Sequence, residues 1–129
     1  MHIPDTFTLE ELQSRLAGWV NCVDQIAFGS PSHVYYDEYL NDMDARRNTG
    51  RAIAILKETA DADEIAAIVD RLTRADSKLR EFTEETESCI WREETARKHG
   101  WNRTTHWFYY RRPKIRLDCD RERWPDAIQ

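Results

Sequence analysis

The sequence has few of the residues from which common catalytic and cofactor motifs are built. Only four glycines occur among 129 residues, and none stands in a GxGxxG or GxxxxGK[ST] pattern. Since both phosphate-binding loops need glycines at these spacings, the two common nucleotide cradles are excluded. The cysteines Cys22, Cys89 and Cys119 form no CxxC pair, which argues against a disulfide framework and against a zinc site. We therefore expect reduced thiols, no metal and no cofactor.

Long apolar runs are also missing. No stretch approaches the roughly 18 consecutive apolar residues of a membrane span, and the first residues lack the basic-then-apolar order of a signal peptide. A hydrophobic content of 40% is nevertheless too high for a disordered chain. Because a chain of this length has little room for two cores, we predict one cytoplasmic domain over residues 1–129, with no membrane contact.

A first amphipathic helix is predicted over residues 9–28. Its apolar residues recur at alternating steps of three and four, which places them on one helical face. Thr8 and Glu11 have the spacing of a capping box at the start of this helix. Gly29 suits the left-handed residue that ends a helix. We therefore expect a helix that buries a single stripe.

Two shorter helices are predicted between residues 30 and 60. Ser30 followed by Pro31 supplies a cap and then a proline at the first helical position, where the missing N–H costs nothing. The polar stretch 44–51 interrupts the apolar pattern that follows, and Asn-Thr-Gly at 48–50 predicts a turn. A short helix should then cover about 53–60.

The most regular segment extends from residue 62 to 99. Positions in steps of three and four are apolar or small with two exceptions, Thr86 and Glu93, which is a heptad pattern. A continuous helix of this length would measure about 57 Å. Either the shorter helices cover it in succession, or a second copy covers part of it, or it turns near residues 74–77. The second alternative predicts a homodimer through six apolar side chains: Ile65, Ile68, Leu72, Leu79, Phe82 and Ile90.

After Gly100 the apolar period changes from about 3.6 to 2. In an extended segment, Thr105, Trp107 and Tyr109 alternate with His106, Phe108 and Tyr110. Residues 114–119 alternate between polar and apolar side chains, and residues 111–113 can form the bend between the two segments. This pattern predicts a β-hairpin that packs on the helices.

The predicted fold is mainly α. We expect a helical bundle with one long heptad-patterned helix over residues 1–100, and a C-terminal aromatic β-hairpin with its tail over residues 101–129. Cys119 would share the buried face of the hairpin. It is therefore expected to be a core thiol and not a nucleophile activated by His106.

The net charge of −5 conceals an uneven distribution. Residues 1–96 carry −10, residues 97–116 carry +7 without any acid, and residues 117–129 carry −2. The basic segment also contains five aromatic residues. Guanidinium groups bind phosphates and aromatic rings stack on bases, so one alternative is nucleic-acid or nucleotide binding. The residues expected to bind are Arg103, Trp107, Tyr109, Arg111, Arg112 and Lys114. In the other alternative, the aromatic rings form the inner face of the hairpin, and the arginines at its rim extend toward solvent or pair with the acidic helices of the same protein.

Protein binding without catalysis is the favoured function. No catalytic motif is present, while an acidic stretch and a group of tyrosines suit a docking surface. The expected partner is another protein or a ribonucleoprotein, whose surface the chain would occlude in the manner of an immunity-protein or phage anti-defence inhibitor. The side chains expected at this interface are Tyr35, Tyr36, Glu81, Glu84, Glu85 and Glu87.

Overall fold

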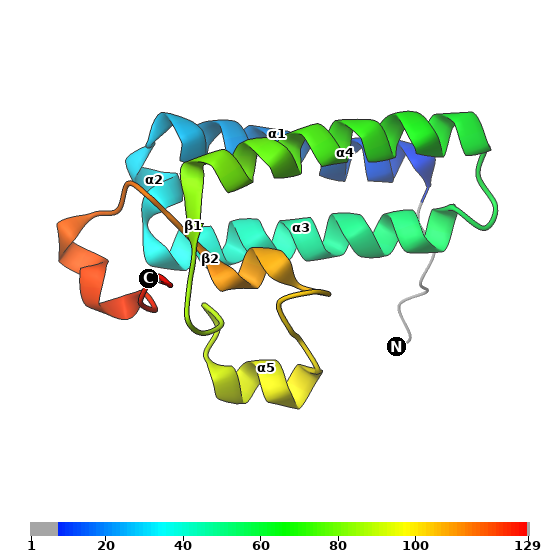
Figure 1. Cartoon of the computed structure of the whole chain (residues 1–129). Coiled ribbons are helices and arrows are strands. Elements are labelled where there is room, and N and C mark those ends of the chain that lie inside the picture. Colours follow the sequence, from blue (N-terminus) through cyan, green and yellow to red (C-terminus); the bar gives the residue numbers. More distant parts are fainter. Residues whose placement is uncertain (1–7, 129) are drawn as a thin grey trace, which may run out of the picture.

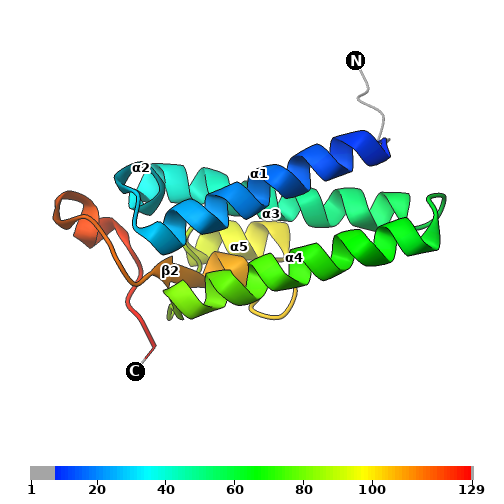
Figure 2. The ribbon, with the colours of Figure 1, turned by 90° about the horizontal axis from the view of Figure 1, so that it is seen from above.

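The computed structural model describes residues 8–128 and confirms a mainly helical fold (Figure 1). Three long helices lie side by side: α1 (Leu9–Phe28), α3 (Tyr36–Leu56) and α4 (Ala62–Phe82). The short helix α2 (Pro31–Val34) connects the first two. Helices α1 and α4 point in the same direction and α3 in the opposite one (Figure 2). Residues 1–7, where no signal-peptide pattern is seen, and residue 129 lie outside the described part.

The C-terminal third of the chain packs against α3 and the end of α4. It contains α5 (Glu93–His99) and two 3₁₀ helices, η1 (Trp107–Tyr110) and η2 (Asp118–Arg123). Strands β1 (Thr83–Glu85) and β2 (Arg111–Pro113) form a two-stranded antiparallel sheet. On the other side of β1, Thr86 forms an isolated bridge with Ala127, and β1 thus lies between β2 and the tail.

The predicted first helix is confirmed at both ends. The Thr8 hydroxyl accepts a hydrogen bond from the backbone N–H of Glu11 at 3.1 Å, which satisfies one of the free donors of the first turn. Gly29 closes the helix with φ of 81°, a conformation that glycine adopts without a steric penalty. Five apolar residues of α1 are buried at the predicted spacing: Leu12, Leu16, Trp19, Val23 and Ile26.

Helix α3 is continuous through residues 48–50, so the turn predicted there is wrong. The polar residues that interrupt the apolar pattern have partners inside the protein. The Thr49 hydroxyl donates to the carbonyl of Ala45 at 2.9 Å, and Arg46 forms a bidentate pair with Asp76 of α4. These polar side chains face neighbouring elements, and they therefore do not end the helix.

The heptad segment is not one helix. Helix α4 ends at Phe82, and Thr83 adopts extended backbone angles, φ −129° and ψ 167°. Helix α4 is continuous through residues 74–77, so the alternative of a turn there is wrong. Thr83 leaves the helix because β1 pairs with β2, in the register Thr83 with Pro113. Helices α1 and α3 cover α4 within one chain, as the first of the three alternatives expects.

The small antiparallel sheet near the C-terminus is confirmed, but its strands differ from the predicted ones. Residues 111–113 form a strand and not a bend, and their partner is β1 instead of residues 114–119. Residues 107–110 form η1, in which Phe108, Tyr109 and Tyr110 are all buried, so no alternation of faces remains. Cys119 lies exposed in η2 and is not a core thiol.

None of the helices between residues 8 and 128 combines the length and the apolarity that a bilayer span requires.

Candidate functional site

Glu84 is the point at which the basic segment meets the acidic one. It lies opposite Arg112 in the sheet, and its Oε1 accepts from Arg112 Nε at 2.8 Å and from Arg116 Nη1 at 3.1 Å. Burial raises the pKa of Glu84, but hydrogen bonds and charge from the two guanidinium groups outweigh this and lower it below its ordinary value. Glu84, Arg112 and Arg116 therefore already have partners within the chain.

Other basic side chains of the segment hold the backbone around β1. Arg111 Nε donates to Thr83 Oγ1 at 2.7 Å, and Lys114 Nζ donates to the carbonyl of Glu81 at 2.9 Å. Arg103 Nη2 donates to the carbonyl of Glu87 at 2.7 Å. The opposite charges of residues 81–87 and 97–116 thus meet inside one molecule, as the second interpretation of the basic segment expects.

The two predicted base-stacking rings differ in their access to solvent. Tyr109 is completely buried, and its hydroxyl donates to Asp44 Oδ1 at 2.5 Å. Trp107 is half-buried, and the guanidinium carbon of Arg80 lies 4.1 Å from its ring centroid. Tyr109 therefore cannot stack on a base, and one face of Trp107 is already covered.

A cleft remains open between the end of α4 and η1. It has a volume of about 340 Å³ and is lined by Arg80, Glu85, Arg103, Trp107, Tyr110 and Arg111. We call it the arginine cleft. Three guanidinium groups face a single carboxylate here, although the whole chain is acidic. The structure thus brings together three of the six predicted binding residues: Arg103, Trp107 and Arg111.

The structure exposes some residues of the predicted protein interface and buries or pairs the others. Tyr36 is buried, and its hydroxyl donates to the carbonyl of Ile90, while Tyr35 is half-buried. Glu84 has the arginine partners described above. The three exposed members are Glu81, Glu85 and Glu87. These lie around β1 and far along the chain from the tyrosines.

Most of the residues predicted to self-associate belong to the chain's own core. Ile68, Leu72, Leu79 and Ile90 are buried, and Ile65 is half-buried. Phe82 is the exception at 36% exposure. Nothing in the structure tests a homodimer, which stays a prediction.

Exposed apolar side chains gather where α1 and α4 end. Phe28 is 86% exposed, Ile115 56% and Phe82 36%. A Cβ atom at Gly29 would lie 3.2 Å from Ile115 Cδ1, and Lys114 N donates to the carbonyl of Phe82 at 3.1 Å. The chain after β2 therefore crosses both helix ends, which lie close together in Figure 2. We call Phe28, Phe82 and Ile115 the apolar end.

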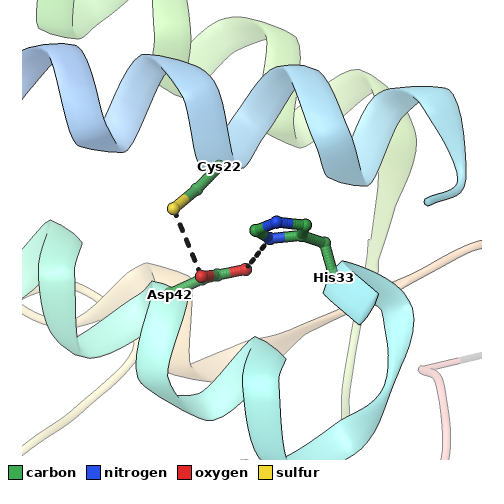
Figure 3. Close-up of side chains that lie close together, drawn as sticks. All are labelled: Cys22, His33 and Asp42. Carbon is green, nitrogen blue, oxygen red and sulfur yellow. Dashed lines mark hydrogen bonds and ion pairs between the residues drawn. The ribbon is translucent and has the colours of Figure 1, made fainter. Parts of the chain in front are cut away.

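A separate polar cluster joins three helices. Cys22 of α1, His33 of α2 and Asp42 of α3 point toward one another (Figure 3). Asp42 Oδ2 lies 2.8 Å from His33 Nδ1, and Asp42 Oδ1 accepts from Cys22 Sγ at 3.2 Å. No sequence pattern indicates this cluster, because residues so spaced on different helices share no motif. The sequence holds one indication of a buried polar group. Asp42 stands beside Met43 and three residues after Tyr39, on an apolar face of its helix.

The electrostatics of this cluster disfavour a reactive thiolate. Burial, together with the charge of Asp42, raises the pKa of Cys22 to about 12, so the thiol is protonated at neutral pH. Burial also raises the pKa of Asp42, although hydrogen bonds from His33 and Cys22 oppose this effect. The carboxylate lies between the thiol and the imidazole, whereas activation of a nucleophile needs the imidazole next to the thiol. The arrangement therefore gives no support to cysteine catalysis.

Cys22 also lines a pocket that opens between α1 and α3. The pocket has a volume of about 300 Å³ and is lined by Arg15, Gly18, Cys22, Asn41, Asp44, Ala45 and Asn48. Cys22 thus belongs both to the cluster and to the wall of this pocket.

Comparisons of the chain with protein-family models, with curated proteins and with solved structures gave no match. The functional proposals therefore rest on three local features, which are the apolar end, the arginine cleft and the Cys22–His33–Asp42 cluster.

Proposed function

We propose that the protein is a non-enzymatic binding factor that docks a partner protein on its apolar end. The exposure of Phe28, Phe82 and Ile115 at one place carries this proposal. They are three of the five large apolar side chains that are exposed among residues 8–128. Single exposed apolar residues are common, but a group of them is typical of a protein interaction site.

The surroundings of the apolar end resemble the rim of a protein interface. Lys78 Nζ of α4 and Asp24 Oδ1 of α1 form an ion pair at 2.7 Å, each one helical turn before the exposed phenylalanine of its helix. Glu81 and Lys114 adjoin Phe82 and Ile115 in the chain and are exposed. An apolar centre with charges of both signs around it is typical of a protein interface. The partner would be a free protein or part of a ribonucleoprotein, and binding would occlude its surface.

Two substitutions at the apolar end test this proposal. Phe28→Asp and Ile115→Asp place charges where the partner would bury apolar area, so capture of the partner from an extract of the source organism should fall at least tenfold. Val69→Asp is the matched control, because Val69 is 40% exposed on α4 but lies away from the helix ends. Quantitative mass spectrometry of the captured proteins at moderate salt, after nuclease treatment, measures the effect.

Retention of the same partner by all three variants would contradict the proposal. Circular dichroism must first show that each variant is folded, which is expected since the replaced side chains are exposed. A second copy of the chain as the partner would appear as a dimer in sedimentation velocity, lost in Phe28→Asp.

The arginine cleft favours a second candidate function, the binding of nucleic-acid phosphates. Its three guanidinium groups suit phosphate oxygens. Since Arg80 covers a face of Trp107 and Tyr110 is buried beneath Arg103, at 4.8 Å from ring centroid to guanidinium carbon, contacts to phosphate and not base stacking are expected.

Fluorescence anisotropy with a labelled single-stranded RNA of about 20 nucleotides separates the two candidates. Phosphate binding should weaken steeply between about 50 and 200 mM salt. It should also be lost in Arg80→Ala plus Arg103→Ala, while Phe28→Asp leaves it unchanged. This second function is refuted if the wild-type protein does not bind the RNA even at the lower salt concentration.

A further inference from the structure

The Cys22–His33–Asp42 cluster offers three different metal-binding groups at one place. Thiolate, imidazole and carboxylate together suit a transition metal and not Mg²⁺ or Ca²⁺, which prefer oxygen ligands alone. Their ligand atoms all lie within 4.8 Å of one another. From this geometry we propose that Cys22, His33 and Asp42 bind a divalent transition-metal ion of the Zn²⁺ class.

The observed separations lie near those of a tetrahedral site. Bond lengths of about 2.0–2.1 Å to nitrogen or oxygen and about 2.3 Å to sulfur place tetrahedral ligand atoms roughly 3.3–3.6 Å apart. The present distances are 2.8 Å from Asp42 Oδ2 to His33 Nδ1 and 3.2 Å from Asp42 Oδ1 to Cys22 Sγ, and the three ligand atoms all lie within 4.8 Å of one another. Shifts of about 1 Å in side-chain positions would therefore bring one oxygen of Asp42, the imidazole nitrogen and the sulfur to the separations of a tetrahedral site.

The helices of the bundle hold the three ligands in place. Each ligand comes from a different helix, and Asp42 is 4% exposed within the core of the bundle. Cys22 lines the pocket between α1 and α3, which supplies an entry path for the ion. Three protein ligands with one side facing a pocket match sites whose fourth position is held by water or by a small ligand.

The charges around the cluster also favour a cation. Glu38 precedes Asp42 by one turn of α3, and its negative charge adds to the effect of burial, which is the main cause of the raised pKa of both Asp42 and Cys22. When an ion binds, the Cys22 thiol proton is released to solvent, and metal bonds replace both hydrogen bonds to Asp42.

Titration of the metal-free protein with Co²⁺ and with Zn²⁺ tests the proposal. We expect one Co²⁺ per chain, visible-region bands typical of tetrahedral cobalt, and a thiolate-to-cobalt charge-transfer band that Zn²⁺ abolishes. Calorimetry should give the same stoichiometry for Zn²⁺. Binding should also raise the thermal midpoint, because the ion bridges three helices of the folded state only.

Two pairs of variants assign the ligands. Cys22→Ser should remove the charge-transfer band and weaken Zn²⁺ binding more than 100-fold, whereas Cys119→Ser, at an exposed cysteine in η2, should change neither. His33→Gln should weaken binding similarly, with His99→Gln, at an exposed histidine of α5, as its control. These magnitudes exceed the roughly 10- to 100-fold effect of groups that only support a ligand.

Either of two results would overturn the proposal. One is a wild-type protein that shows no charge-transfer band and binds no Zn²⁺ at micromolar concentrations; the cluster then serves only to satisfy the buried Asp42. The other is binding that persists in a folded Cys22→Ser plus His33→Gln variant, which would assign the ion to different residues. The wild-type spectrum decides the first result even if a variant fails to fold.

Discussion

One half-buried carboxylate, that of Asp76, connects the three long helices of this protein. Asp76 of α4 accepts from Trp19 Nε1 of α1 at 3.1 Å, and its two oxygens accept from Arg46 Nε and Nη2 of α3 at 2.9 Å each. Both members of the ion pair are less than one sixth exposed. One aspartate therefore fixes the relative positions of all three long helices, as well as the guanidinium group that lies near Phe108.

Removal of this carboxylate should be costly. Asp76→Ala leaves the charge of Arg46 and the indole N–H of Trp19 without their partner, and we expect a loss of about 2–4 kcal/mol in the free energy of unfolding. Urea denaturation measures this loss. Asp70→Ala on the same helix, whose pair with Arg74 is exposed, should cost less than about 1 kcal/mol. Equal losses for the two variants would show that the Asp76–Arg46 pair contributes no more to stability than an exposed ion pair.

Glu84 predicts an acid-sensitive contribution to stability. Because its pKa is lowered in the folded protein, the unfolded chain binds more protons at acidic pH. The stabilisation is therefore complete above the ordinary glutamate pKa of about 4.3 and is lost as the pH falls through the lowered value. Denaturation midpoints measured from pH 6 downward should differ between wild type and Glu84→Gln at pH 6 and converge in acid. Glu58→Gln, at an exposed position after α3, should show no such convergence.

At the scale of elements, local signals describe the ends of α1 well. Thr8 and Gly29 act through the backbone of their own helix, and no distant residue is needed for either role. The end of α4 is different, since the heptad pattern continues past Phe82 while the helix does not. Pairing of β1 with β2, 28 residues later in the chain, competes with helix continuation there, and only the folded chain supplies that partner.

Gly18 within α1 and Gly29, which caps its end, should respond to substitution in opposite ways. Gly29→Ala forces a left-handed backbone on alanine and brings its Cβ to 3.2 Å from Ile115, so we expect a loss of about 1–2 kcal/mol. Gly18→Ala places a Cβ in open space inside the helix and should stabilise the protein by about 0.5–1 kcal/mol. Urea denaturation of the two variants checks both signs. A stabilising Gly29→Ala would refute the assigned role of this residue as a helix cap.

At the scale of the whole molecule, the uneven charge of the sequence becomes an internal contact. The segment of +7 packs on β1, where Glu84 pairs with Arg112 and Arg116 and Glu85 pairs with Arg111, so two of its seven positive charges are neutralised. The charge that remains to bind a partner is therefore smaller than the charge of either segment suggests. Three features are left, namely an apolar end, an arginine cleft and a cluster of potential metal ligands.

The sequence by itself determined the helical class, the first helix with its caps, and the presence of strand-forming residues near the C-terminus. These features follow from periodicity and from contacts within a few residues. Tertiary structure decided where α4 ends, which strands pair, and that Tyr109 and Tyr36 are buried instead of available for binding. It also decided that Cys22, His33 and Asp42 meet, because packing of three helices brings together residues that no local pattern relates.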